Sequence, residues 1–170
     1  GLAATGFEEV GLLSLSSADH SEIGPLAKQL ADRYEDDRVS LSLPSTRVDA
    51  FNIDLANEFS RNGRRSGLTF APEGGSERLR RVINKMVSKD DLIRTVSAAY
   101  AQGWRQVKLY FMCGLPTETD EDVLEIAEMA HDVIRAGREA TGSRDIRCTV
   151  SIGGFVPKPH TPFQWAAQAD

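Results

Sequence analysis

Residues 67–85 read GLTFAPEGGSERLRRVINK, and this stretch contains the pattern that decides the fold. The short apolar run at 67–71 predicts a buried β-strand. Two glycines and Ser76 follow it, and serine is typical of the residue that begins a helix. We therefore predict a strand that turns directly into a helix, which is the first half of a β-α-β unit.

The same alternation recurs along the whole chain. Short runs rich in β-branched or aromatic residues predict strands, most of them buried on both faces or nearly so, at residues 7–15, 39–43, 67–71, 106–113 and 146–155. Apolar residues spaced three and four positions apart predict helices between them, at residues 23–34, 52–63, 92–100 and 123–137. Strand centres about 30 to 40 residues apart leave room for a crossover helix, so we predict parallel strands with right-handed connections.

Chain length limits how much of a barrel can form. A complete (β/α)8 barrel needs about 250 residues, whereas this chain has 170. We predict an α/β fold: a partial TIM-like barrel of about five parallel strands with helices outside, in a single domain spanning residues 1–170. An open, doubly wound sheet fits the same alternation. Residues 1–6 read as the last turn of a helix, which predicts that further chain precedes them.

Composition argues against several classes of protein. The chain has 20 Lys and Arg against 25 Asp and Glu, a net charge of -5, which is not the basic balance of a dedicated nucleic-acid binder. No apolar run approaches the roughly 20 residues that cross a bilayer, and no secretion signal begins the sequence, so we predict a cytoplasmic protein. Cys113 and Cys148 stand alone in apolar runs, which predicts buried, unreactive thiols rather than metal ligands.

Polar and conformationally special residues gather in the loops that follow the predicted strands. In parallel α/β proteins, ligands bind at the carboxyl ends of the strands, where these loops converge. The loops cover residues 14–20, 44–49, 72–76, 114–120 and 156–163. The loops at the opposite ends, such as 101–104, are ordinary turns. One rim of the sheet is therefore the predicted working face.

Glu73 indicates which ligand this rim favours. The N-terminus of the following helix is worth roughly 0.3 to 1 kcal/mol to an anion, but a carboxylate about 5 Å away would repel a phosphate charge by roughly 3 kcal/mol. Glu73 therefore favours hydroxyl donors or a cation, such as a ribose diol or a sulfonium. Gly74 would let the ligand approach the backbone, and Ser76 would bind it or cap the helix. The alternative is a plain tight turn with Glu73 solvated.

Other strand-end residues are candidates with an ordinary alternative. Arg47 could anchor a ligand carboxylate, or pair with Asp49 or Glu73. Ser16 and Ser17 lie just past the end of the first predicted strand, where they could contact a ligand or simply form the turn.

Two later loops add further candidates. Gly114 could let a strand approach a flat ring, although Thr119 and Asp122 after it mainly read as a helix start, as Ser88 and Asp91 do for the helix at 92–100. Prolines stiffen the loop at 156–163 and would hold Lys158 and His160 over the sheet end as candidate substrate contacts.

Four segments together resemble the radical S-adenosylmethionine (SAM) superfamily, and closely a branch related to methylthiotransferases and cobalamin-linked members. They are LSLPSTRVD at 41–49, FAPEGGSERL at 70–79 with INK at 83–85, GLPTETDED at 114–122, and FVPKPHTPFQW at 155–165. In that family a partial (β/α)6 barrel holds a [4Fe-4S] cluster and SAM at the carboxyl ends of the strands. The resemblance implies that this chain holds strands two to six.

The resemblance also implies a SAM site drawn from several strand-end loops, comprising Glu73, Gly74, Ser76, Arg47, Ser16, Ser17, Gly114 and Val156. Arg47 would face the methionine carboxylate or the ribose. Gly114 and Val156 would line the adenine. Ser16 and Ser17 fall where the family has a Gly-Gly-Glu type segment for the methionine amino group, but the glycines and the acid are absent here.

The implied activity needs residues that this sequence lacks. The family's cluster cysteines, spaced C-x3-C-x2-C, would precede this chain, so we expect it to need the remainder of a parent chain and to be inactive alone. Cys113 and Cys148 are not substitutes. In the parent, the reduced cluster would cleave SAM to a 5′-deoxyadenosyl radical that abstracts hydrogen from a substrate. Candidate substrates are tRNA or a protein, and cobalamin is a candidate partner.

Two other functions remain open from the sequence. The chain could be a truncated TIM-barrel enzyme that acts on a hydroxylated metabolite. It could instead be a non-catalytic scaffold or an RNA-contacting module that uses the basic cluster of Arg61, Arg64 and Arg65, although the same cluster also fits a solvated loop.

Overall fold

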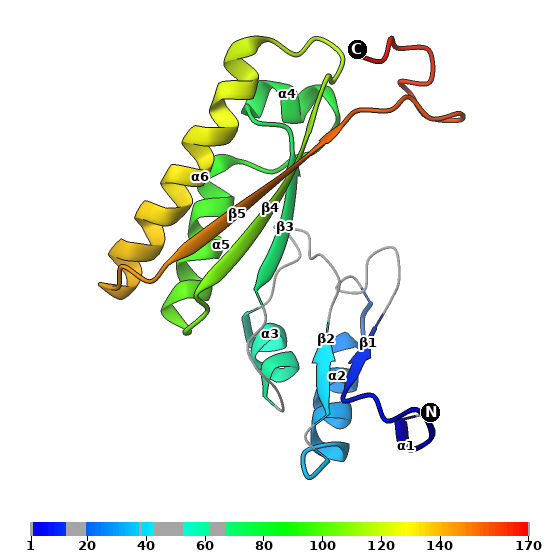
Figure 1. Cartoon of the computed structure of the whole chain (residues 1–170), viewed down its shortest axis with the longest axis vertical. Coiled ribbons are helices and arrows are strands. Elements are labelled where there is room, and N and C mark those ends of the chain that lie inside the picture. The colour runs from blue at the N-terminus through cyan, green and yellow to red at the C-terminus, as the bar shows by residue number, and fades with distance from the viewer. Residues whose placement is uncertain (1, 13–19, 38, 43–52, 62–66, 170) are drawn as a thin grey trace.

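The computed structural model describes residues 2–12, 20–37, 39–42, 53–61 and 67–169 (Figure 1). Its elements follow the chain in the order α1 (Leu2–Thr5), β1 (Glu9–Gly11), α2 (Ile23–Arg33), β2 (Ser40–Ser42), α3 (Ile53–Ser60), β3 (Leu68–Glu73), α4 (Glu77–Val82), α5 (Lys89–Ala101), β4 (Gln106–Cys113), α6 (Asp120–Thr141) and β5 (Arg147–Gly154). The predicted alternation of strands and helices is confirmed. The helix predicted to begin at Ser76 is α4, which is short, and α5 follows it before β4.

Every strand pairing in the described ranges is parallel. β1 pairs with β2, and β3, β4 and β5 form a three-stranded sheet in that order. The central strand β4 is in register with β5 along its whole length, from Gln106 beside Arg147 to Cys113 beside Gly154. The parallel α/β architecture expected of a partial barrel is therefore present. The described strands form two separate sheets rather than one continuous row, and they do not close into a barrel.

The main core lies between the three-stranded sheet and the helices α5 and α6, which lie along one face of it in Figure 1. Val107, Leu109 and Phe111 of β4 point into this core and are buried, whereas Gln106 and Tyr110 on the same strand are exposed. The expectation that most strands are buried on both faces is wrong for β4 and β5. The reason is that the described helices cover only one face of this sheet, so side chains alternate between core and solvent.

Local sequence explains where the two long helices begin. The Ser88 hydroxyl accepts a hydrogen bond from the Asp91 backbone N–H at 3.0 Å and starts α5. Thr119 starts α6 through a capping box, in which the Asp122 carboxylate also accepts the Thr119 backbone N–H at 2.8 Å. α6 ends at Gly142, whose φ of 65° favours glycine. Both helix starts were predicted from these residues.

The N-terminal part of the chain has a smaller core of its own. Ala27 and Ala31 of α2 pack with Leu41 of β2 and Leu55 of α3. On α3, Ala56 belongs to a further buried cluster that contains Trp104, so this helix contributes to both regions. In the described residues, no helix has the length and apolar character that a membrane span requires.

Candidate functional site

The carboxyl ends of β3, β4 and β5 meet at one rim. Glu73 at the end of β3 lies in register beside Phe111 of β4. The Phe155 backbone N–H, just after β5, donates to the Cys113 carbonyl oxygen at 2.8 Å. The loops that follow these three strands therefore begin at the same edge (Figure 1). This rim is where the sequence predicted the working face.

Glu73 occupies an unusual position at this rim. Its φ is 70°, in the left-handed region that residues other than glycine rarely adopt. The β3–β4 register shifts between Phe70 and Glu73, so the strand is irregular where this residue lies. Non-glycine residues in such conformations cost on the order of 1–3 kcal/mol and cluster at functional sites.

The carboxylate of Glu73 is half-buried, with 30% of its side chain exposed. This burial raises the pKa of Glu73, and the charge of Lys85 acts in the opposite direction. The Lys85 Nζ lies 3.9 Å from the Glu73 Oε1, which is an electrostatic contact rather than a close hydrogen bond. The plain-turn alternative also made Ser76 the helix N-cap, which the structure shows, whereas Glu73 is only partly exposed to solvent.

The two glycines after Glu73 make room for protein atoms. A Cβ on Gly75 would lie 2.1 Å from the Asp122 carbonyl oxygen and 2.8 Å from a side-chain carbon of Ile126. A Cβ on Gly74 would lie 3.3 Å from the Arg80 backbone nitrogen. We expected the glycines to allow close approach of a ligand, whereas these contacts show close approach of protein atoms. Gly75 lets the turn pack directly against α6.

Ser76 caps the short helix α4. Its hydroxyl accepts a hydrogen bond from the Leu79 backbone N–H at 2.9 Å and donates to the Asp122 carboxylate. The residue is 3% exposed. Of the two roles considered for the Ser76 side chain, the geometry supports helix capping, because the hydroxyl is enclosed and already bonded to protein groups.

Arg80 binds the backbone of the turn at Gly74 and Gly75, and the sequence did not identify it as a site residue. Arg80 is only 1% exposed, and burial lowers the pKa of its guanidinium. The Nε donates to the Val87 carbonyl at 2.7 Å, and Nη1 donates to the carbonyls of Gly74 at 3.1 Å and Gly75 at 2.7 Å. A buried cation that satisfies three backbone acceptors stabilises the turn that presents Glu73.

A second buried charge, Asp122, was expected only as part of a helix cap. Asp122 is only 4% exposed, and its carboxylate accepts hydrogen bonds from Arg78, Ser76 and Thr119. The bonded Arg78 guanidinium, followed by the Ser76 and Thr119 donors, holds the pKa of Asp122 well below its usual range. No spacing in the sequence indicates that residues 76 and 122 meet.

The loop after β4 is closely packed. Gly114 has a φ of 81°, and its backbone N–H donates to the Glu118 carboxylate. A Cβ on Gly114 would lie 2.9 Å from the Cβ of Ala169. Ala169 therefore lies beside Gly114, where the sequence suggested that a flat ring could approach the strand.

The loop after β5 carries the predicted adenine and substrate contacts. Val156 is 51% exposed, and Lys158 and His160 are also exposed. The ring of Phe163 packs edge-on against Phe155 at 6.2 Å between centroids, which anchors the loop to the end of β5. These side chains are accessible at the rim, and their roles stay predictions.

Some predicted residues are not placed. Ser16, Ser17 and Arg47 lie outside the described residues, as do Arg64 and Arg65. Their proposed contacts with SAM or RNA therefore remain predictions.

Arg61, the described member of the basic cluster, forms ion pairs with Asp32 and, at 3.2 Å, with Glu58. Both partners are protein carboxylates on α2 and α3, so the charge of Arg61 is already compensated. The solvated-loop interpretation of the cluster fits this residue better than an RNA contact.

The cysteines do not fit the ligand set of an iron–sulfur cluster. Cys113 and Cys148 pack against the core between the sheet and the helices. Burial raises the pKa of both thiols, that of Cys148 to about 11, whereas metal ligation needs a thiolate. Elsewhere in the described ranges, no three His, Cys, Asp or Glu side chains are grouped as metal ligands would be.

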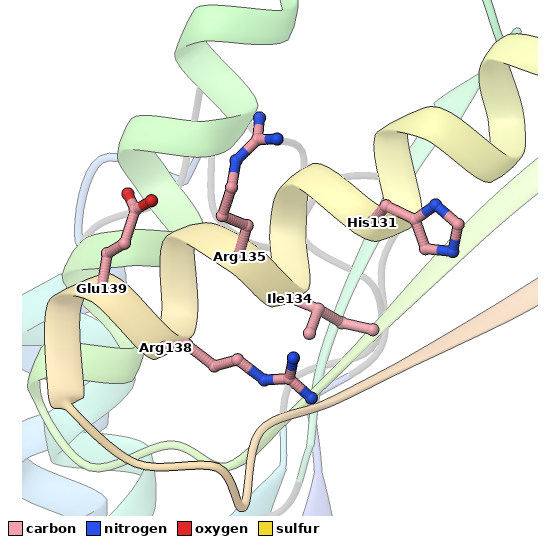
Figure 2. A pocket seen from close by; sticks show the side chains of 5 residues that line it. All are labelled: His131, Ile134, Arg135, Arg138 and Glu139. Atoms are coloured by element: carbon pink, nitrogen blue, oxygen red, sulfur yellow. The ribbon is translucent and has the colours of Figure 1, made fainter.

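A surface pocket of about 500 Å³ lies on α6, lined by His131, Ile134, Arg135, Arg138 and Glu139 (Figure 2). These residues belong to the half of α6 that precedes β5, whereas the rim lies at the start of the helix. The pocket is therefore at the opposite end of the sheet from Glu73.

Three comparisons relate this chain to known proteins. The family model described as Radical SAM superfamily matches residues 2–130. An uncharacterized protein from Methanocaldococcus jannaschii is 35% identical over 164 residues, which are 96% of this chain and 33% of that protein, so the chain spans about a third of its relative. Coproporphyrinogen III oxidase from Escherichia coli, described as a radical SAM enzyme, matches with a TM-score of 0.49 and 17% identity over 69% of this chain and 26% of that one. The family match covers most of the chain, which therefore belongs to the radical SAM superfamily.

Proposed function

We propose that this chain supplies part of the SAM-binding rim of a radical SAM iron–sulfur enzyme, and that Glu73 contacts the cofactor. Membership of the superfamily supports the reaction class. The observation that carries the proposal is Glu73 itself, a half-buried carboxylate in a left-handed conformation at the carboxyl end of a parallel strand. Such a strained position is retained only where the surrounding structure holds it.

The charges near Glu73 indicate which part of SAM it contacts. A carboxylate alone would attract a sulfonium about 5 Å away by roughly 3 kcal/mol at an effective dielectric of about 20. The ammonium of Lys85, 3.9 Å from the Glu73 carboxylate, opposes that attraction. A ribose diol needs only the acceptor oxygens and no net charge, so we propose that Glu73 binds the ribose hydroxyls.

The remaining parts of the proposal come from the family resemblance. Bound SAM and a reduced [4Fe-4S] cluster would supply the radical chemistry of an oxidoreductase-like enzyme, with the cluster held by parent-chain residues outside this sequence. Arg47, Ser16, Ser17, Gly114 and Val156 would complete the SAM site. In this proposal, the chain's own residues bind and orient SAM and exclude water from it.

The substrate side is also a proposal. Lys158 and His160 are exposed after β5 and would contact a substrate, for which tRNA or a protein is the candidate class. The branch related to methylthiotransferases and cobalamin-linked members, cobalamin as a partner, and a cytoplasmic location belong to the same proposal.

Binding measurements on the full-length parent protein, reconstituted without oxygen, test the role of Glu73. Glu73→Gln keeps the size of the side chain but removes the charged acceptor, and hydrogen bonds to charged groups contribute about 1.5–3 kcal/mol. We expect the Kd for SAM, measured by calorimetry, to rise at least about tenfold. Glu77→Gln is the control, because the Glu77 carboxylate forms an exposed ion pair with Arg81 on the same helix.

The outcome separates the candidate functions. Equal SAM affinity in wild type and Glu73→Gln, or no SAM binding by the reconstituted wild type, would reject the proposal. If adenosine binds as tightly as SAM and no SAM cleavage follows, the result favours an enzyme acting on a hydroxylated metabolite.

A further inference from the structure

We propose that Asp122 and Arg78 are positioning residues that hold the Glu73 turn in its ligand-binding geometry by locking it to the loop after β4. This inference rests on the proposed function of Glu73. It adds two residues that act at a distance from the cofactor and do not touch it.

Asp122 connects two loops that are far apart in the sequence. On one side its carboxylate accepts the hydroxyl of Ser76, 46 residues earlier, in the turn after β3. On the other side it accepts the Thr119 backbone N–H at 2.8 Å and the Thr119 hydroxyl at 3.1 Å, in the loop after β4. The same carboxylate therefore caps α6 and fastens the neighbouring turn.

Arg78 reinforces this connection from the α4 side. Its Nη2 pairs with the Asp122 carboxylate, and its Nε lies 3.3 Å from the same carboxylate. Nη2 also donates to the Thr117 carbonyl at 2.7 Å, and Nη1 to the Thr117 hydroxyl at 3.3 Å. Thr117 has a φ of 68°, so the arginine holds the loop after β4 at a residue with a strained backbone.

The contacts at Asp122 leave little capacity for a ligand. A carboxylate has about four acceptor positions, and here the donors of Ser76, Arg78 and Thr119 occupy them. The residue is also 4% exposed. Asp122 therefore acts on bound SAM only through the turn that it holds.

The packing at Gly75 makes the turn sensitive to this contact. The Gly75 backbone lies so close to α6 that a Cβ would meet the Asp122 carbonyl oxygen at 2.1 Å. Glu73 is two residues before this point and three before Ser76. An ordinary capping box would need only Thr119 and Asp122, so the bond to Ser76 and the pair with Arg78 are additional. Loosening them would move Glu73 while leaving most of α6 unchanged.

Asp122→Asn tests the inference, with Asp132→Asn as the matched control. Asp132 lies on the same helix, has a side chain 14% exposed, and pairs with Lys89 and Arg135. Both variants remove a largely buried negative charge that faces basic groups, but only Asp122 contacts the Glu73 turn. We measure stability by urea unfolding, the Kd for SAM, and the pKa of Glu73 by carbon NMR of its carboxylate, all in the full-length protein.

We expect both variants to lower stability. Only Asp122→Asn should raise the Kd for SAM at least about tenfold and move the pKa of Glu73 toward that of an exposed glutamate, because a loosened turn exposes the carboxylate. Arg78→Lys, which keeps the charge but loses the paired geometry, should show a smaller shift in the same direction. It serves as the milder variant if Asp122→Asn does not fold.

The inference is overturned if Asp122→Asn, or Arg78→Lys in its place, lowers stability while the Kd for SAM and the pKa of Glu73 stay at the wild-type values. The proposed function has a separate test. It fails if the wild-type protein binds no SAM, or if Glu73→Gln binds SAM with wild-type affinity. If the proposed function fails, a changed pKa of Glu73 in Asp122→Asn would still show that Asp122 positions the turn. The part of the inference that concerns SAM binding would then be overturned.

Discussion

Replacing Glu73 by glycine and by alanine separates its backbone conformation from its carboxylate. Both variants remove the carboxylate and the 3.9 Å contact with Lys85, so these losses cancel when the two are compared. Only alanine keeps the strain of a side chain at a φ of 70°.

The size of the difference follows from two opposing effects. A left-handed conformation costs an L-residue roughly 1–2 kcal/mol, which glycine avoids. Glycine in turn loses about 0.5–1 kcal/mol more backbone entropy on folding. Glu73→Gly should therefore be more stable than Glu73→Ala by about 0.5–1 kcal/mol, although both should lose affinity for SAM.

Urea unfolding of both variants measures this difference, and calorimetry with SAM measures the loss of binding. Asn84, with a φ of 57°, provides a control in the same region, because Asn84→Gly and Asn84→Ala should differ in the same direction. If Glu73→Ala is as stable as Glu73→Gly while the Asn84 pair differs as expected, the backbone at residue 73 is not strained in solution. A stable glycine variant with full SAM affinity would instead remove the functional reason for a glutamate there.

Three further predictions concern the surrounding residues. Gly75→Ala should lower the free energy of unfolding by about 3 kcal/mol, because its Cβ would overlap the Asp122 carbonyl. At Gly153 a Cβ would meet no described residue other than its chain neighbours within 4 Å, so Gly153→Ala should change this free energy by less than about 0.5 kcal/mol. Similar losses for the two variants in urea unfolding would contradict the packing. The pKa of Asp122 is lowered in the folded state, so its stabilisation is present above the unfolded pKa of about 4 and is lost as pH falls through the folded value. The stability gap between wild type and Asp122→Asn should then narrow below about pH 4, and a gap that is constant from pH 7 to acid would refute this. Because burial raises the pKa of Cys148 to about 11, iodoacetamide at pH 8 should label it on the order of 100 times more slowly in native than in urea-unfolded protein, by mass spectrometry.

Several features were predictable because they depend on neighbouring residues. Ser88 and Thr119 each bond a backbone N–H three residues ahead, so the starts of α5 and α6 follow from the local sequence. Strand-end loops meet at one rim in any parallel α/β fold, so the rim was predictable once the alternation of strands and helices was recognised.

Other features depend on residues that are distant in the sequence. Arg80 appears in the sequence as one of several arginines after the glycines, and nothing in the pattern shows that it is buried beneath the turn. The glycines were expected to let a ligand approach the backbone, whereas Gly75 faces Asp122 of another element.

The amino-acid sequence alone determined the alternation of strands and helices, the helix caps and the family, since each depends on short-range hydrogen bonds, periodic burial or motif order. The tertiary structure alone decided the environment of Glu73: its left-handed backbone, the neighbouring charge of Lys85, and the buried contacts of Arg80 and Asp122 that hold the turn. The physical reason is that burial and electrostatics at this rim arise where separate elements pack together. Residues 76 and 122 become neighbours only after β3, β4 and α6 have assembled.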